Sequence, residues 1–98
     1  MILTIIHVFG GIIPHPLLYL IITNMQYYEN ISSYIKQKRI EKGISLNAFA
    51  IENELEPATL SRYENGKRAI NLMNLVKIAN GFNQSLAEFL IDFEKKYI

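Results

Sequence analysis

The chain has 98 residues, of which 50% are hydrophobic, and this length suffices for one small domain but not for two. It contains no cysteine, which excludes a disulfide framework and a thiolate metal site, and its net charge is only +1. Its two histidines, His7 and His15, lie far in sequence from any residue that they could activate, and two imidazoles alone make a poor metal site. We therefore expect no enzyme activity, no metal and no cofactor.

Residues 1–24 form an apolar segment without charge, about as long as the ~20 residues that span a bilayer. Gly10, Gly11, Pro14 and Pro16 interrupt it, and proline inside a helix is costly. Secretion is not expected, because the segment has no basic start and no small-residue cleavage site. Three interpretations stay open: a true translation start at Met25, a membrane anchor that leaves the domain in the cytoplasm, or an extra hydrophobic element packed on the domain or a partner.

Residues 25–98 are expected to form the folded domain, which starts with a helix from about Asn30. Ile31, Tyr34 and Ile35 recur at helical spacing in this stretch. Gly43 stands where the helix should end, since glycine readily adopts the left-handed conformation of a helix C-terminus. The first predicted helix therefore lies between Asn30 and Gly43.

Two short helices should follow. Ser45 is a good N-cap for the first of them, which carries Phe49 on its inner side. Pro57 suits the first position of the next helix, and Gly66 suits its C-terminal left-handed position, which leaves about eight helical residues. Leu60 should face inward from this helix.

The last two predicted helices have clear start signals. Asn71 caps a helix that ends near Gly81, and Ser85 with Glu88 forms a capping box for the final helix. The final helix places on one face Leu86, Phe89, Leu90, Phe93 and Tyr97. No stretch of four or more residues alternates with period two, so we expect an all-α fold.

Three sequence strings follow one another with a characteristic spacing: IKQKRIEKGISLNAFA, LSRYENGKR and LVKIANGF. With them, residues 31–90 resemble the Cro and phage-repressor (XRE) type of helix-turn-helix domain. The resemblance implies a compact five-helix bundle whose helix-turn-helix unit covers about residues 46–65. In such domains the second helix of the unit lies in the major groove, while the first crosses the DNA backbone.

The resemblance also assigns roles to individual positions. The residues that it places at base edges in the groove are Pro57, Ala58, Thr59, Ser61 and Arg62. The residues that it places at phosphates are Asn65, Lys67 and Arg68. Arg39 matches a family arginine that packs beside the glutamate of Glu-Asn-Gly, which implies a structural ion pair between Arg39 and Glu64.

The sequence departs from the family pattern near the turn of this unit. Leu46 replaces a glutamine that is expected to contact phosphate, and Glu54 replaces the usual turn glycine, which implies strain if its φ is positive. Glu52, Glu54 and Glu56 also bring three carboxylates beside the reading helix, where they repel DNA phosphates.

One groove helix contacts few base pairs, so we expect a homodimer on an inverted repeat. The final helix carries more apolar surface than one small bundle needs, and the predicted dimer interface consists of Phe89, Leu90, Phe93 and Tyr97. On this hypothesis Phe93→Glu gives a folded monomer.

The predicted function is sequence-specific binding of double-stranded DNA by a small, cytoplasmic, repressor-like transcriptional regulator of bacterial or phage origin. The resemblance also admits a restriction-modification controller or the antitoxin of a toxin–antitoxin pair. Two alternatives remain: a module whose helix-turn-helix mainly binds a protein partner, and a regulator tethered to the membrane through residues 1–24.

Overall fold

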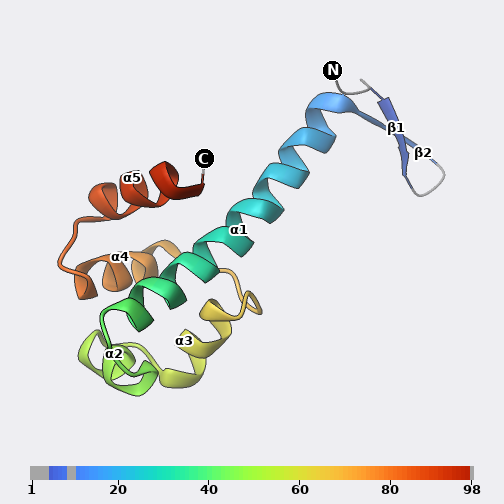
Figure 1. Ribbon diagram of the computed structural model, residues 1–98. Coiled ribbons are helices and arrows are strands. Elements are labelled where there is room, and N and C mark those ends of the chain that lie inside the picture. The colour runs from blue at the N-terminus through green and yellow to red at the C-terminus, as the bar shows by residue number, and fades with distance from the viewer. Residues whose placement is uncertain (1–4, 9–10, 98) are drawn as a thin grey trace.

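The computed structural model describes the backbone of residues 5–8 and 11–97, and the side chains of residues 26–97. Figure 1 shows a small bundle of helices at one end of a long first helix. The elements in chain order are β1 (Ile5–Val8), β2 (Gly11–Pro14), α1 (His15–Glu41), α2 (Leu46–Glu52), α3 (Pro57–Glu64), α4 (Leu72–Gly81) and α5 (Leu86–Tyr97). From residue 26 onward the described chain is all-α, with the five predicted helices.

The N-terminal segment contains an antiparallel hairpin that the sequence pattern did not predict. β1 pairs with β2 in a register that joins Ile5 to Pro14 and Val8 to Gly11. The strands are short and almost uniformly apolar, so they have no period-two alternation, although their β-branched residues favour strands. The side chains of His7 and His15, for which no metal role is expected, lie outside the described ones.

Helix α1 is 27 residues long and begins at His15, well before the predicted start at Asn30. Pro16 lies in its first turn, where the missing N–H of proline costs nothing. The helix therefore runs without interruption across the predicted domain boundary at residues 24 and 25, and the hairpin lies at its far end from the other helices (Figure 1). Among the described residues, no helix is both long enough and apolar enough to cross a bilayer.

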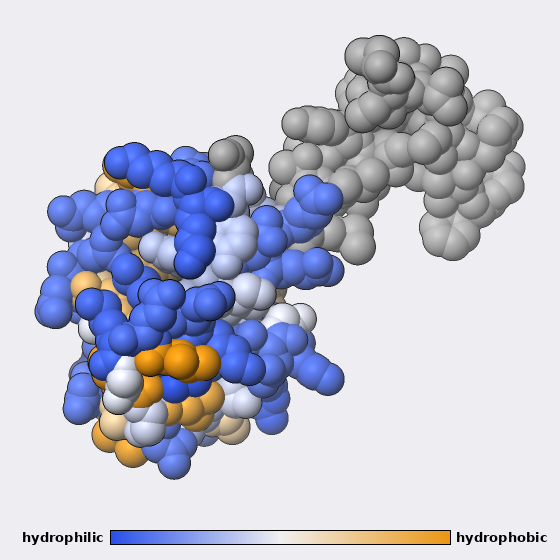
Figure 2. Space-filling model, viewed as in Figure 1, coloured by the Kyte–Doolittle hydropathy of each residue, from blue (hydrophilic) through white to orange (hydrophobic). Residues whose placement is uncertain are grey.

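The core lies between the second half of α1 and the four shorter helices. Its central side chains are fully buried, and the largest of them are Tyr63, Phe49, Phe89, Phe93, Ile35, Leu60 and Ile78. Burying one such side chain stabilises the fold by about 1.5–3 kcal/mol. Figure 2 shows that the visible surface around this core is mostly hydrophilic, with a hydrophobic area at the end where α1 meets α2.

The predicted dimer interface is wrong at two of its four positions. Phe89 and Phe93 each have an exposed fraction of 0%, because they pack inside the monomer against aromatic side chains of α1. The ring centroid of Tyr34 lies 5.3 Å from that of Phe89 and 5.5 Å from that of Phe93. Leu90 and Tyr97 are half-buried. Of α5, only the outer side is therefore accessible to a second copy.

Four helices end in the same way. The residue that follows the C-cap has a positive φ at each end: Gly43 (70°), Glu54 (60°), Gly66 (68°) and Asn83 (59°). The next amide then donates to the carbonyl five residues earlier, as Lys67 does to Arg62 over 2.8 Å. This arrangement is a Schellman motif, which satisfies the free carbonyls of a helix end. Each connection from α1 to α5 thus starts with a closed, hydrogen-bonded turn.

Gly81, the last residue of α4, allows a close approach to α2. A Cβ atom at this position would lie 2.6 Å from Nδ2 of Asn53 and 2.7 Å from Cζ of Phe49. Both neighbours are held in place, since Phe49 is in the core and the Asn53 amide donates to the carbonyl of Phe49 over 2.8 Å. The absence of a side chain here therefore brings α4 against the helix-turn-helix unit.

Candidate nucleic-acid interface

The helix-turn-helix unit consists of α2, a short turn and α3. Helix α2 starts as predicted, because the Oγ atom of Ser45 accepts a hydrogen bond of 3.1 Å from the amide of Ala48. Pro57 occupies the start of α3, also as predicted. The side chain of Glu56, at the N-cap of α3, makes no capping hydrogen bond, so proline is the main local signal for this helix.

The turn between the two helices contains the strain that the sequence implies. Glu54 has a φ of 60°, in the left-handed region that a side chain makes costly by roughly 1–2 kcal/mol. Two contacts hold the turn: the amide of Leu55 donates to the carbonyl of Ala50 over 2.8 Å, and Nζ of Lys77 donates to the carbonyl of Glu54 over 3.2 Å. Leu55 is buried beneath the turn. These contacts fix the angle at which α3 leaves α2.

Helix α3 has a buried side and an exposed side. Leu60, Tyr63 and Glu64 are buried, and they attach the helix to the rest of the domain. All five predicted base-reading residues lie elsewhere on the helix: Ala58 and Arg62 are exposed, while Pro57, Thr59 and Ser61 are half-buried. The sequence therefore divides α3 correctly into an anchoring side and an accessible side.

Arg39 and Glu64 form the predicted ion pair beneath α3. Nε of Arg39 lies 2.7 Å from Oε2 of Glu64, and Nη2 donates to Oε1 over 2.9 Å, so the contact is bidentate. A third bond of 2.8 Å runs from Nη1 to the carbonyl of Ile44. The hydrogen bond with Glu64 raises the pKa of Arg39 above its usual value, which outweighs the opposite effect of burial. The pair is structural, because both side chains are buried.

The three predicted phosphate-contacting residues follow α3 and are exposed. Asn65 also has a local role that the sequence did not indicate, because its Nδ2 donates to the carbonyl of Ser61 over 2.8 Å and so helps to cap α3. Lys67 and Arg68 lie just beyond the turn at Gly66. The two cations therefore lie at the C-terminal end of α3.

A side-chain hydrogen bond also attaches α3 to α4. Nδ2 of Asn74 donates to the hydroxyl of the buried Tyr63 over 2.7 Å. Asn71 caps α4 at the same time, since its side chain accepts from the amide of Asn74 over 2.8 Å. The sequence indicated the cap but not the link to Tyr63, because the partners lie on different helices.

The acidic residues near the turn are also accessible. Glu52, Glu54 and Glu56 are all exposed, and they lie between the end of α2 and the start of α3. Acidic side chains thus lie at the N-terminal end of α3, and basic side chains lie at its C-terminal end. The described residues contain no group of three or more acidic or imidazole side chains that could hold a metal ion.

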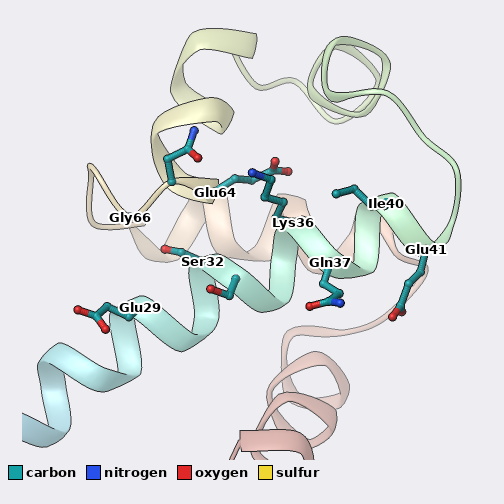
Figure 3. Close-up of a pocket in the computed structure, with 10 residues that line it drawn as sticks. Glu29, Ser32, Lys36, Gln37, Ile40, Glu41, Glu64 and Gly66 are labelled. Atoms are coloured by element: carbon teal, nitrogen blue, oxygen red, sulfur yellow. The ribbon is translucent and has the colours of Figure 1, made fainter.

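A pocket of about 660 Å³ lies between α1 and the end of α3 (Figure 3). It is lined by Glu29, Ser32, Ser33, Lys36, Gln37, Ile40, Glu41, Glu64, Asn65 and Gly66. Sequence reasoning missed Lys36 as a candidate site residue. The available signal was its position three residues before Arg39, which places both side chains on the same face of α1.

Comparisons with known proteins agree with this geometry. The family model HTH_3, described as helix-turn-helix, matches residues 35–89. Control protein C.MunI from a Mycoplasma species is 40% identical over 63 residues, which cover 63% of this chain and 85% of that protein. The match thus covers most of the length of the control protein.

Two solved structures are similar in fold. The clp gene regulator ClgR from Corynebacterium glutamicum is 23% identical with a TM-score of 0.62, over 70% of this chain and 73% of that one. An HTH_3 family transcriptional regulator from Vibrio cholerae is 28% identical with a TM-score of 0.62, over 69% of this chain and 38% of that one. With its helix-turn-helix unit, its family match and its control-protein relative, this chain belongs to the HTH_3 helix-turn-helix family.

Proposed function

We propose that this DNA-binding regulator recognises its operator by inserting α3 into the major groove. The observation that carries the proposal is the division of α3, whose buried side is anchored through Leu60, Tyr63 and Glu64 while its polar side is accessible. A rigid helix with accessible polar side chains can reach the edges of base pairs in a groove about 12 Å wide. Because its target is DNA, we expect the domain to work in the cytoplasm.

The base-reading group of the proposal is Pro57, Ala58, Thr59, Ser61 and Arg62. Arg62 is the strongest candidate in it, because its guanidinium is exposed and can donate two hydrogen bonds to O6 and N7 of guanine. Ala58 can contact the methyl group of thymine, and Thr59 and Ser61 offer hydroxyl groups to either kind of base. Asn65, Lys67 and Arg68 form the phosphate-contacting group, which fixes the register of α3 in the groove.

The relative named as a control protein favours a controller among the regulator classes that the resemblance admits. A controller that regulates nearby genes should bind DNA upstream of its own gene. The test is an electrophoretic mobility shift of the full chain with its own upstream DNA and with a scrambled duplex, at two salt concentrations. A retained preference for the upstream DNA at the higher salt supports the proposal, and equal binding of both duplexes contradicts it.

A protein-interaction module is the second candidate, and the exposed carboxylates of Glu52, Glu54 and Glu56 favour it. Like charge beside α3 weakens the attraction to phosphates. Absence of any duplex binding at low salt in the same mobility shift would favour this candidate over a DNA reader. An antitoxin that binds both DNA and a toxin would still shift the upstream duplex.

Arg62→Ala should weaken binding of the operator by about 1–3 kcal/mol and relax the preference at one base pair. The reason is that the substitution removes donors to a base edge. Fluorescence anisotropy with operators changed one base pair at a time measures both effects. A uniform loss of affinity for all duplexes would show that Arg62 contacts phosphate instead.

Lys67→Ala and Arg68→Ala should each lower the affinity for every duplex without changing the base preference. Each lost phosphate contact should reduce the slope of log affinity against log salt by about 0.9. Titrations at several salt concentrations provide this slope. Lys95→Ala, which removes an exposed cation from α5, is the matched control and should leave the slope unchanged. If the loop variants behave like this control, the loop does not contact DNA.

We propose a homodimer as the DNA-binding form, with the outer side of α5 as its contact surface. Leu90 is half-buried and Ile91 is 53% exposed, so both remain accessible after the core is complete. The two reading helices of a two-fold dimer would contact half-sites about 34 Å apart in an inverted repeat. Such a dimer enlarges the small interface that one domain offers to DNA.

Ile91→Glu should give a folded monomer with weakened binding of the operator. The reason is that the substitution introduces one carboxylate in each copy, and the two would repel each other across the proposed contact surface. Sedimentation equilibrium measures the association state, and circular dichroism verifies that the helices persist. Lys95→Gln provides a control, because Lys95 is exposed and lies one turn after Ile91 on the same side of α5. A wild-type monomer that binds the inverted repeat tightly would contradict the dimer, and so would an Ile91→Glu protein that stays dimeric.

A further inference from the structure

The pocket between α1 and the end of α3 lies outside the groups assigned to base reading. Its lining comes from residues 29–41 on α1 and residues 64–66 at the end of α3. Lys36 is the only cation in this lining, and within residues 26–97 the one ion pair of the structure joins Arg39 to Glu64. Lys36 is therefore an exposed charge at the edge of a polar hollow.

The position of Lys36 relative to α3 follows from the ion pair. Arg39 reaches from α1 to Glu64, and Lys36 lies one helical turn before Arg39 on the same face of α1. Figure 3 accordingly shows the side chain of Lys36 extending from α1 toward the end of α3, where Glu64 lies. Lys36 thus stands beside the reading helix, although it belongs to another element.

The pocket reaches the C-terminal end of α3. Asn65 directly follows Glu64, is exposed, and lines the pocket itself. Ser61 lies one turn earlier on α3 and is joined to Asn65 by the hydrogen bond between the amide of Asn65 and the carbonyl of Ser61. A helix in the major groove has a sugar–phosphate strand on each side. One strand should therefore pass the flank that faces α1.

We propose that this pocket receives a phosphate of the DNA backbone, with Lys36 as its counter-charge and the hydroxyl of Ser33 as a further donor. The inference rests on the proposed insertion of α3 into the major groove and adds a phosphate contact from α1. Lysine and serine side chains are common phosphate donors in protein–DNA interfaces. Ser33 is exposed and lines the pocket three residues before Lys36, on the same face of α1.

The carboxylates of the pocket limit where a phosphate can lie. The charge of Glu64 is compensated by Arg39. Glu29 and Glu41 are exposed and lie toward the two ends of the α1 lining, before Ser33 and after Lys36. Both repel an anion, so the favourable position lies between them, at Lys36 and Ser33. This arrangement selects one phosphate instead of attracting the whole strand.

Lys36→Gln in the full chain should weaken the binding of every duplex and leave the base preference unchanged. Since one lost contact lowers the salt slope by about 0.9, a rise from about 50 to about 200 mM salt should weaken this variant about 3.5-fold less than the wild type. Lys36→Arg should retain the wild-type slope. Lys95→Gln on α5 is the matched control, and a thermal melt verifies that Lys36→Gln is folded.

Ethylation interference of the operator identifies the contact. In each half-site, ethylation of one phosphate should prevent binding of the wild type but not of Lys36→Gln. Ethylation of the phosphates that Lys67 and Arg68 contact should still prevent binding of both proteins. A Lys36→Gln protein with wild-type slope and interference pattern would overturn the pocket assignment, provided that Lys67→Ala still loses its contact. If Arg62→Ala and Lys67→Ala are also without effect, the insertion of α3 itself is wrong.

Discussion

Glu64→Ala should destabilise the domain by about 3–5 kcal/mol, with or without DNA, because it leaves a buried arginine without its counter-charge. Arg39 and Glu64 have exposed fractions of only 9% and 5%, so both charges depend mainly on each other for stabilisation in the folded domain. Domains of this kind have a total stability of about 5–15 kcal/mol, so this loss is a large share of the total. Urea denaturation followed by circular dichroism measures the change in the free energy of unfolding.

Two variants separate the effect of the pair from the effect of a lost carboxylate. Glu52→Ala removes an exposed carboxylate from α2 and should change stability little. The double variant Arg39→Met with Glu64→Leu should recover much of the loss, since an apolar pair needs no counter-charge. A Glu64→Ala protein with the wild-type urea midpoint would mean that the pair contributes nothing to folding.

Phe93→Glu should unfold the domain, contrary to the folded monomer expected from the sequence. Phe93 has no exposed surface, and its ring centroid lies 5.1 Å from that of Tyr27 and 5.3 Å from that of Tyr97. Losing a buried phenylalanine costs about 3–5 kcal/mol, and burying a carboxylate without a partner adds several more. The sum is comparable to the whole stability of a small domain.

Circular dichroism at 25 °C should therefore show little helix in Phe93→Glu. Ile91→Glu, two residues earlier on the same helix, is the control, because Ile91 is exposed and the variant should keep its helices. If Phe93→Glu retains the wild-type spectrum, α5 is not packed on α1 as described.

The N-terminal starts of α2, α4 and α5 could be predicted, because the sequence signals for a helix start are local. Ser45, Asn71 and the pair Ser85 and Glu88 act within one helical turn, and each makes the hydrogen bond that its sequence position indicates. The start of α1 could not be predicted in this way. Its first half has no polar face, and Pro16 was interpreted as a helix breaker, whereas it lies in the first turn.

The role of the apolar face of α5 could not be predicted from its spacing. A core-facing stripe and a dimer-facing stripe have the same period, so the pattern of Phe89 and Phe93 fits both. The distinction depends on Tyr27 and Tyr34, which approach from the far end of the sequence through the folding of α1. The inward-facing positions of α3 could be predicted, because α3 is one short helix and the burial of Leu60 and Tyr63 follows directly from its period. The roles of its exposed residues toward DNA stay predictions.

The accessibility of Lys36 also depends on tertiary structure. A lysine in an amphipathic helix is usually a solvated residue, and only the pairing of Arg39 with Glu64 places it beside α3. The family resemblance predicted the pairing of Arg39 with Glu64. It assigned no role to Lys36, which lies one turn before Arg39. The position of Lys36 beside α3 is therefore a property of the folded domain that the sequence of the helix-turn-helix unit does not contain.

The repeated ends of α1 to α4 have a consequence for the DNA. Each connection closes on main-chain hydrogen bonds, and the side-chain contacts of Lys77 with the turn and of Asn74 with Tyr63 add to them in holding α3 against α2 and α4. A two-fold pair of such domains would present its reading helices at a fixed separation and tilt. In such a complex the duplex would be the softer partner, and it would have to bend or twist to fit this spacing. Base pairs between the half-sites, which no side chain contacts, would thus contribute to affinity through the ease with which they deform.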